Sequence, residues 1–411
     1  MRPAKSRTLP RLRRSLDVFP SPLPDQPGLL LRDPYQYSDS ILVVPPLLVP
    51  LLALHDGLGT ELDLHAALAR ALGRVDRSEL ADRFTRSLSE AGFLEDQAFE
   101  ERRKAVVARF GAAPVRTPSH AGAAYPAEPE ALGETLRAWL ATDPPRAPTP
   151  ADRIGVAAPH VSPEGGVASY AAAYAGLGPS LRERVFVILG TSHYGEPDCF
   201  GLTRKPFATP LGTARTCASL VDDLERAAPD AVRIEDYCHA VEHSIELQVL
   251  FLQHAVAPDV EILPVLCGPF ATGRGRRRRP EDDDGVRRFF AALGEVQATL
   301  GQRGFFVLGV DLAHVGRRYG DEVGARAGEG PLAEVARRDR ERLAAVTGGD
   351  ADGFWDLVVG PEGDDLKWCG AAPLYTFVKT VPAARGTLRS YEQWNIDAES
   401  VVSFAAIDWH P

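Results

Sequence analysis

Apolar positions divide the chain into a short leading region and a longer region in which strand-like and helix-like patterns alternate. In the longer region, apolar runs of strand length occur at residues 154–158, 185–189, 260–266, 305–310, 387–391 and 401–407. Helical spacing of apolar residues occurs around them, at 131–140, 166–177, 217–227, 245–254, 286–300, 331–346, 353–359 and 371–381. This alternation predicts an α/β fold with a central, mostly parallel sheet flanked by helices.

The leading region has a different pattern and predicts a separate small domain. Residues 1–25 are rich in proline and arginine, which predicts a disordered N-terminal tail. Short strands followed by helical patterns predict a small winged-helix-like domain over residues 26–105. A linker at 106–118 then leads to the larger domain, residues 119–411.

Two phrases in the small domain resemble a known domain type. His55-Asp-Gly-Leu-Gly-Thr60 precedes two predicted helices, and Glu90-Ala-Gly-Phe-Leu94 follows them. Together they resemble the small PqqD-like winged-helix domains, which bind peptides by strand addition. A structural cap on the larger domain explains the same pattern, and the residues alone do not separate the two interpretations.

The composition limits the classes of function. The formal net charge of −10 over 411 residues disfavours a general nucleic-acid-binding protein. The most apolar segment, 41–54, contains three prolines and is shorter than the roughly 20 residues that a membrane-spanning helix needs. The five cysteines are odd in number and form no C-x-x-C pair, which indicates reduced thiols in a cytoplasmic protein. We therefore expect no nucleic-acid partner and no membrane segment.

Histidines follow two of the predicted strands. His160 ends the phrase Ile154-Gly-Val-Ala-Ala-Pro-His160, and His193 comes shortly after the apolar run 185–189. Because the carboxyl ends of parallel strands lie at one edge of a sheet, where open α/β proteins bind their ligands, the two histidines predict a shared site. A lone histidine is more often a hydrogen-bonded or surface group, so the grouping carries this prediction. Other histidines in phrases with turn or small residues are His120, His239, His243 and His314.

Six phrases recur in an order and spacing that we associate with a known family. They are Ser119-His-Ala-Gly-Ala-Ala-Tyr125, Ala158-Pro-His160, Ile188-Leu-Gly-Thr-Ser-His193, Glu242-His-Ser-Ile-Glu246, Asp311-Leu-Ala-His314 and Cys369-Gly-Ala-Ala-Pro373. The set is similar to the MEMO family, also called the AmmeMemoRadiSam system protein B family. That family resembles the class III extradiol dioxygenases in fold, so the resemblance also implies a central sheet flanked by helices.

The resemblance implies a metal site made from three of these phrases. The family's ligands correspond here to His160, His193 and Cys369. Two imidazoles and one thiolate leave positions open for water or substrate, which is typical of a catalytic site. A thiolate makes the site softer than the two-histidine, one-carboxylate triad of non-haem iron oxygenases. The resemblance implies iron(II), and the softer thiolate donor makes copper and zinc alternatives.

Three further residues are predicted to be catalytic groups that line the substrate pocket. Asp311 and His314 lie three apart at the end of a predicted strand. We expect His314 to act as acid or base, with Asp311 either orienting it or accepting a hydrogen bond in the cavity. His243 begins a predicted helix, where Glu242 or Glu246 would set its tautomer. Ordinary capping of that helix by the same acidic residues is the alternative.

One other motif competes with this interpretation. His239-Ala-Val-Glu242-His243 fits the H-x-x-E-H pattern of inverted zinc proteases, although so short a pattern arises easily by chance. No G-x-S-x-G elbow, Walker loop or Rossmann glycine fingerprint occurs. Their absence disfavours acyl, phosphoryl and nucleotide chemistry.

The sequence departs from the family phrases at two places. Val161-Ser-Pro-Glu-Gly165 stands where the family has Ala-Gly-Tyr, and Ala371-Ala-Pro373 stands where it has Arg-His-Pro. Loss of the tyrosine and the histidine predicts a changed pocket wall. Glu164 is either an extra carboxylate near His160 or part of a surface loop.

Together these observations predict a MEMO-family mononuclear metalloprotein. The expected chemistry is a redox or oxygen-dependent reaction on a small molecule, carried out by a dioxygenase-like, non-haem metal-dependent oxidoreductase. The alternative is a non-catalytic adaptor that binds a peptide or protein in the same cleft. The resemblance further implies work beside a radical-SAM protein and an AMMECR-type protein.

Overall fold

The computed structural model describes residues 6–73, 79–141, 152–270, 279–360 and 363–411. The chain divides into two compact units, Met1–Ala112 and Ala113–Pro411. Each unit has its own hydrophobic core. Among the described residues, no helix is both long and apolar enough to cross a lipid bilayer.

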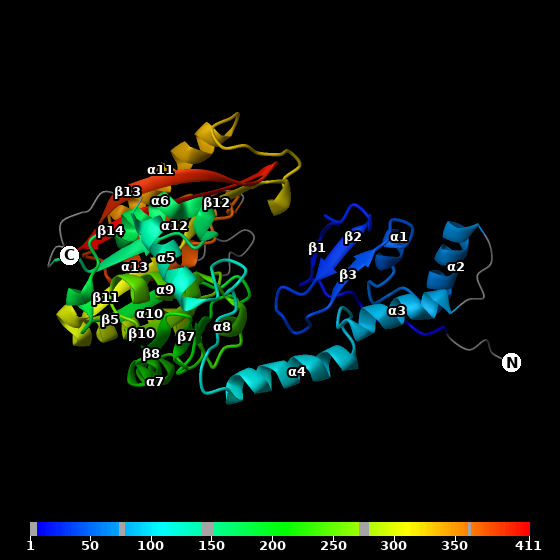
Figure 1. The fold of residues 1–411 in the computed structure, drawn as a ribbon, viewed down its shortest axis with the longest axis horizontal. Helices are drawn as coiled ribbons and strands as arrows, with labels where there is room; N and C mark the ends of the chain where they lie inside the picture. The colour runs from blue at the N-terminus through cyan, green and yellow to red at the C-terminus, as the bar shows by residue number, and fades with distance from the viewer. Residues whose placement is uncertain (1–5, 74–78, 142–151, 271–278, 361–362) are drawn as a thin grey trace. The chain divides into compact units, whose positions relative to one another are not determined.

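The small unit is a three-stranded antiparallel sheet followed by helices (Figure 1). Its elements are β1 (Asp17–Pro20), β2 (Leu29–Arg32), β3 (Ile41–Val44), α1 (Val49–Leu52), α2 (Glu61–Leu72), α3 (Leu80–Glu90) and α4 (Gln97–Ala112). Leu31, Leu64 and Phe93 are buried at its centre. Thr60 and Asp63 form a reciprocal capping box that starts α2. The apolar segment 41–54 therefore forms β3 and α1 of this core.

Residues 6–25 differ from the expected disordered tail. Part of this segment forms β1, and the Arg13 side chain is buried. The Arg13 guanidinium donates to both carboxylate oxygens of Asp33 at 2.9 Å and lies 4.0 Å from the centre of the Phe99 ring. Composition alone does not show that one arginine of a basic segment is buried, so this order was not predicted. Residues 1–5 lie outside the described residues.

The boundary between the units also differs from the predicted one. Helix α4 continues through residue 105 and ends at Ala112, where the small unit ends. Residues 106–112 of the predicted linker 106–118 are therefore helical. The PqqD-like interpretation of the small unit stays a prediction.

The larger unit is built on an 11-stranded sheet whose centre is parallel. Strands β4, β11, β5 and β10 lie side by side in parallel, β14 pairs antiparallel with β4, and β6 pairs antiparallel with β10. The strands are β4 (Gly155–Ala158), β5 (Val185–Thr191), β6 (Phe200–Leu202), β7 (Phe207–Thr209), β8 (Gly212–Thr216), β9 (Val232–Ile234), β10 (Glu261–Cys267), β11 (Gly304–Gly309), β12 (Asp311–Gly316), β13 (Arg385–Asp397) and β14 (Ser400–His410). The predicted α/β class with a mostly parallel central sheet is confirmed.

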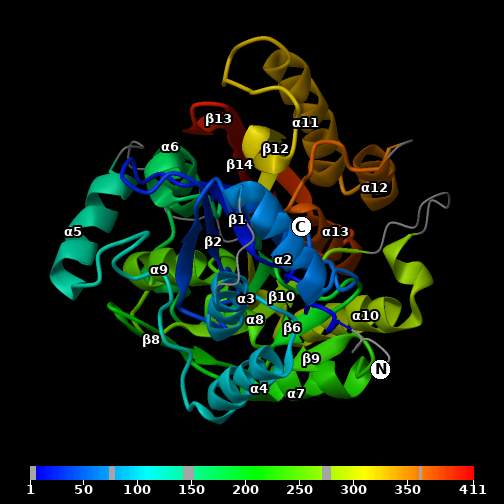
Figure 2. The same ribbon diagram turned by 90° about the vertical axis from the view of Figure 1, so that its right-hand side faces the viewer.

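Helices cover both faces of this sheet. They are α5 (Pro129–Leu140), α6 (Pro163–Tyr174), α7 (Ala218–Ala227), α8 (Cys238–Val241), α9 (Ser244–Ala255), α10 (Asp284–Leu300), α11 (Leu332–Thr347), α12 (Ala351–Val359) and α13 (Ala371–Thr380). Helices α5, α6 and α9 pack on one face, and α7, α10, α11, α12 and α13 pack on the other. Figure 2 shows α5, α6 and α9 on one side of the strands and α10, α12 and α13 on the other.

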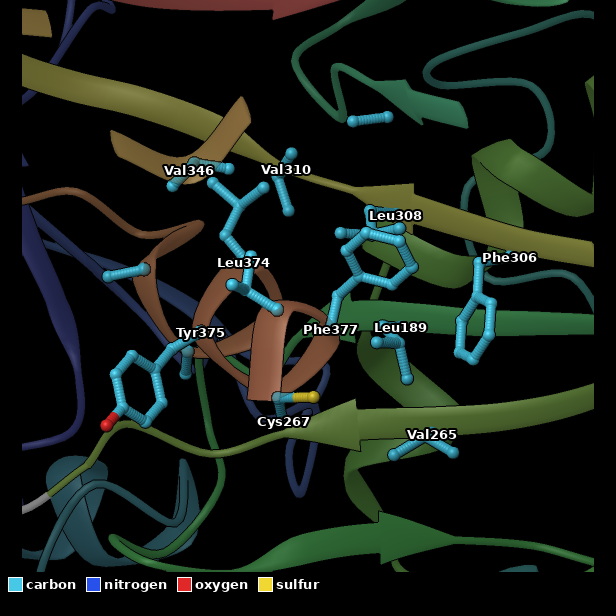
Figure 3. Packing of buried hydrophobic residues seen from close by; sticks show 14 of the residues in the cluster. Leu189, Val265, Cys267, Phe306, Leu308, Val310, Val346, Leu374, Tyr375 and Phe377 are labelled. Atoms are coloured by element: carbon cyan, nitrogen blue, oxygen red, sulfur yellow. The ribbon is translucent and has the colours of Figure 1, made fainter. Parts of the chain in front are cut away.

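Burial on both faces explains why the central strands are continuous apolar runs. Every residue of β5 is buried, and its successive side chains enter opposite hydrophobic layers. Figure 3 shows one of these layers, in which Leu374 and Phe377 of α13 lie against Leu189 and Leu308 of the sheet.

Two glycines let the start of α9 lie directly over the strand ends. A Cβ on Gly190 of β5 would lie 2.6 Å from Ser244 Oγ, and a Cβ on Gly309 of β11 would lie 2.3 Å from Ser244 O. Contacts this short are not tolerated, so any larger residue would push α9 away. The residues just before Ser244 are thereby held at the carboxyl edge of the sheet, where ligands of open α/β proteins bind.

Candidate metal centre

The predicted site residues come from several elements that end at the same edge of the sheet. His160 follows β4, and His193 follows β5. His243 precedes the first residue of α9, and Cys369 lies just before α13. The apolar strands position His160 and His193, because each strand ends where its polar phrase begins, and the starts of α9 and α13 position His243 and Cys369.

Three imidazoles and one thiol gather at this edge. His160, His193 and His243 each offer one ring nitrogen, and these nitrogens lie within 4.8 Å of one another. The Sγ atom of Cys369 lies 3.4 Å from Nε2 of His160. Imidazole nitrogens and a thiolate sulfur are the donors that zinc, copper and iron share. The donor set therefore fits a transition-metal ion.

Hydrogen bonds turn the Nε2 atom of each imidazole toward this cluster. Nδ1 of His160 lies 2.9 Å from the carbonyl oxygen of Gly309, to which it donates. Nδ1 of His193 and Nδ1 of His243 lie 3.1 and 3.0 Å from the same oxygen, Oε1 of Glu242. A metal-binding histidine typically donates its second ring N–H to a carboxylate or a carbonyl in this way.

Glu242 is the buried carboxylate that holds two of the imidazoles. Its side chain is 1% exposed, and it also accepts from the backbone N–H groups of His193 and His243 at 2.8 and 2.9 Å. Burial alone would raise the pKa of Glu242, but the charge and hydrogen bonds of the two histidines hold the pKa well below its usual range. The predicted tautomer-setting role therefore belongs to Glu242.

The Cys369 thiol lies where its ionised form is stabilised. Burial alone would raise its pKa, but the imidazolium charges of His160 and His314 and the hydrogen bond from His160 lower the pKa to about 5. Glycine at position 370 lets the backbone next to Cys369 lie close to the strand of Asp311, since a Cβ at Gly370 would lie 2.5 Å from the carbonyl oxygen of Asp311. A thiolate, the form that binds metals, is therefore present at neutral pH.

Protons compete with a metal ion at two of the imidazoles. Burial lowers the pKa of His160, but Asp311 and the Cys369 thiolate outweigh burial and raise the pKa to about 9. Burial likewise lowers the pKa of His193, and Glu242 raises it well above its usual value. Metal binding must displace these protons, so the affinity of the site for metal rises with pH.

Asp311 is a hydrogen-bond acceptor, one of its two predicted roles, but it does not orient His314. Oδ1 of Asp311 accepts from the backbone N–H of His160 at 2.9 Å, and its Oδ2 lies 3.6 Å from Nε2 of that ring. Nδ1 of His314 instead lies 2.9 and 3.1 Å from the carbonyl oxygens of Leu312 and Lys367. The pairing of β12 with β14 shifts register between Asp311 and His314, so the two side chains have different surroundings.

A buried ion pair beside the cluster was not predicted. Glu246 and Arg116 are paired, with side chains 0% and 1% exposed. Glu246 also accepts from the backbone N–H groups of Ser119 and His120 at 3.0 Å and from the Tyr125 hydroxyl. It is therefore the anchor of the loop formed by residues 119–125, called the 119–125 loop below.

This anchor presents a further histidine to the cluster. The ring centre of His120 lies 5.5 Å from that of His243. In the sequence, the place of His120 near the site was indicated only by the phrase that contains His120 and Tyr125, because the contacts of these residues with Glu246 span more than 120 residues. No pattern of local spacing reports a contact at that separation.

The zinc-protease motif is not supported by the geometry. His239 lies in α8, which ends at Val241, whereas His243 precedes α9. The two histidines are therefore not on one face of one helix. Nε2 of His239 lies 3.0 Å from the carbonyl oxygen of Gly201, away from the group of three imidazoles.

The departures from the family phrases have visible structural effects. Glu164 is exposed in the first turn of α6, so the surface interpretation is the one the structure favours. A Cβ on Gly165 would lie 2.4 Å from the Trp394 ring, so only glycine fits beneath that side chain. Trp394 belongs to a small hydrophobic cluster with Val161 and Tyr319, and the Tyr319 ring lies 4.8 Å from that of His314.

Comparison with known proteins gives one consistent result. A family model described as "Memo-like protein" matches residues 116–408. A MEMO1 family protein of Aquifex aeolicus is 26% identical over 297 residues, covering 71% of this chain and 73% of its own length. A MEMO1 family protein of Methanopyrus kandleri is 26% identical over 308 residues, covering 71% and 98%. A MEMO1 family protein of Thermus thermophilus is 29% identical over 267 residues, covering 64% and 72%.

Proposed function

Because the family model matches more than half of its residues, the chain belongs to the Memo-like family, and from that premise we propose that its larger unit is a mononuclear metalloenzyme. The proposed chemistry is a redox or oxygen-dependent transformation of a small molecule. The observation that supports it best is the convergence of three imidazole nitrogens beside a thiol whose ionised form is stabilised.

We propose His160, His193 and Cys369 as metal ligands, with iron(II) as the native ion and copper or zinc as alternatives. The hydrogen bonds to Gly309 and Glu242 support this assignment, because they fix the ring orientation before any ion binds. A bound ion of this kind supplies Lewis acidity and, if it is iron or copper, an electron.

The remaining predicted residues have distinct proposed roles. His314 is the proposed proton-transferring group, since both carbonyl contacts are made by Nδ1 and Nε2 is left for a substrate. Asp311 acts through His160, whose backbone and ring it contacts, and is a positioning residue. His243 lies within the imidazole group itself.

Partial exposure of the cluster supports a small-molecule substrate. The side chains of His193 and His243 are 29% and 31% exposed, although the carboxylate behind them is almost completely buried. Solvent and small solutes therefore reach one side of the imidazoles, while the other side is fixed by buried hydrogen bonds. A structural metal site would instead be closed on all sides.

Metal analysis of anaerobically purified protein tests the proposal. We expect a stoichiometric transition metal in the wild type and loss of that metal in Cys369→Ser. Cys217→Ser is the matched control, because Cys217 is the half-buried N-cap residue of α7 and lies outside the group of close donors. Metal-dependent consumption of O₂ or of a reductant would support an enzyme. Full metal retention by Cys369→Ser, or a metal-free wild type that still binds a partner protein, would contradict the proposal.

A further inference from the structure

The imidazole cluster contains one more donor than the proposed ligand set uses. We infer that His243 is a fourth ligand, so that the ion is bound by three imidazoles and one thiolate. This inference depends on the proposed metal site and changes the role expected for His243 from a catalytic group that lines the substrate pocket to a metal ligand.

The position of His243 relative to His160 matches that of His193. The ring centres of His160 and His193 lie 5.1 Å apart with an interplanar angle of 89°. Those of His160 and His243 lie 5.2 Å apart with an angle of 87°. By its distance and angle to His160, His243 is placed as well as His193 to bind the ion.

One carboxylate aligns the two rings. Nδ1 of His193 and Nδ1 of His243 both face Oε1 of Glu242. Their rings are consequently nearly parallel, with centres 5.1 Å apart and an interplanar angle of 10°. Because Nε2 lies opposite Nδ1 in an imidazole, both Nε2 atoms project to the same side, toward His160.

The other nearby histidines do not share this arrangement. Among the described residues, the group of mutually close donors contains His160, His193 and His243. His120, His314 and Cys369 lie outside it, and of these Cys369 has a hydrogen-bonding contact with the group, 3.4 Å between its Sγ atom and Nε2 of His160. His120 directs Nδ1 to the Ser119 hydroxyl at 2.8 Å and is tied to the 119–125 loop. The inference is therefore specific to His243.

Four protein donors narrow the chemistry that the site supports. An ion that prefers four ligands, such as zinc, would be saturated by the protein and would have no position for a substrate. An ion that accepts six ligands, such as iron(II), would keep two positions. If His243 binds, an enzymatic role therefore requires an ion that expands its coordination beyond four.

Titration of the metal-free full-length chain with Co²⁺ tests the inference. Co²⁺ reports its coordination through its visible ligand-field bands, and thiolate binding through a charge-transfer band. We expect His243→Ala to weaken Co²⁺ binding at least about tenfold, as much as His193→Ala does. The charge-transfer band should persist in His243→Ala, because Cys369 still binds, while the ligand-field bands change. His254→Ala is the matched control, because His254 lies in the last turn of the same helix, outside the group of close donors, and the Co²⁺ affinity of this variant should equal that of the wild type.

Two further measurements distinguish the loss of a ligand from a folding defect in His243→Ala. Added imidazole should restore the ligand-field bands of His243→Ala, since a free ring can replace the missing side chain. In the wild type loaded with Cu²⁺, electron spin echo modulation from remote ring nitrogens should count three imidazoles.

The outcomes separate this inference from the proposed function. A wild type that fails to bind Co²⁺ stoichiometrically would overturn both. Wild-type Co²⁺ affinity and an unchanged spectrum in His243→Ala, or two imidazoles counted in the wild type, would overturn only the fourth ligand.

Discussion

Replacing Glu246 by glutamine measures how much the buried carboxylate stabilises the larger unit. Glu246 accepts from Arg116, from Ser119, from His120 and from Tyr125, and none of its side chain is exposed. Glutamine keeps the shape but replaces one acceptor oxygen with an N–H₂ group, which then faces donors. It also leaves the Arg116 charge buried without its counter-ion.

The expected loss follows from that unpaired charge. Removing one partner of a buried ion pair costs about 3–5 kcal/mol. For a unit of this size, the same loss lowers Tm by roughly 5–10 °C. The backbone carbonyls of His239 and Glu242, which also accept from Arg116, keep the loss from being larger.

The pH dependence follows from the pKa of Glu246. Burial alone would raise this pKa, but Arg116 and the hydrogen bonds from the 119–125 loop hold it well below its usual value. A carboxyl whose pKa is lowered by folding stabilises the native state fully above its unfolded-state pKa, about 4.3, and loses that contribution as the pH falls. The difference between wild type and Glu246→Gln should therefore narrow below about pH 4.

Tryptophan fluorescence during urea denaturation is a suitable assay. All five tryptophans, Trp139, Trp355, Trp368, Trp394 and Trp409, belong to the larger unit, so the signal does not report on the small unit. Glu334→Gln is the matched control, because Glu334 forms an exposed ion pair with Arg337 and should leave the midpoint unchanged. A Glu246→Gln protein within about 1 kcal/mol of the wild type at pH 7, or a difference that stays constant down to pH 3, would refute the reasoning.

Three other predictions follow from single contacts. In metal-free protein, alkylation of Cys369 by iodoacetamide should stay fast down to about pH 5, where the pKa of its thiol lies. The alkylation rate is measured by mass spectrometry as a function of pH, and a midpoint near the usual thiol pKa of about 8.5 would contradict this prediction. Gly370→Ala should destabilise the larger unit by about 1–3 kcal/mol, because the new Cβ would displace either the strand of Asp311 or Cys369 itself. The same displacement should weaken Zn²⁺ binding in calorimetry, and an unchanged Zn²⁺ affinity would show that Cys369 has not moved. Arg13→Ala should cost the small unit about 3–5 kcal/mol by leaving Asp33 buried and unpaired, and should make limited proteolysis there faster; equal rates would show that the pair is dispensable.

The central strands were predictable because their burial leaves a direct mark on the sequence. β4, β5, β10 and β11 are buried on both faces and are therefore continuous apolar runs. β6 and β9 were missed because each has only three residues, which is too short for a periodic pattern. β12 was read as a polar site phrase, since Asp311 and His314 interrupt its apolar positions.

The site residues that directly follow an apolar strand could be predicted from the sequence. A histidine that follows an apolar run is visible in the sequence, and His160 and His193 were found in this way. The sequence does not show which group a buried carboxylate contacts. Asp311 precedes His314 by three residues but contacts His160, about 150 residues away, because the sheet brings β4 beside β11. Glu242 and Glu246 are only four residues apart in the sequence, yet Glu242 holds two imidazoles and Glu246 holds the 119–125 loop.

The chain that joins the two units enters the larger one beside the imidazole cluster. Helix α4 ends at Ala112, and a few residues later Arg116 is fastened to Glu246 and to the carbonyl oxygen of Glu242. A shift of Arg116 would therefore act on the backbone of Glu242, whose side chain holds His193 and His243.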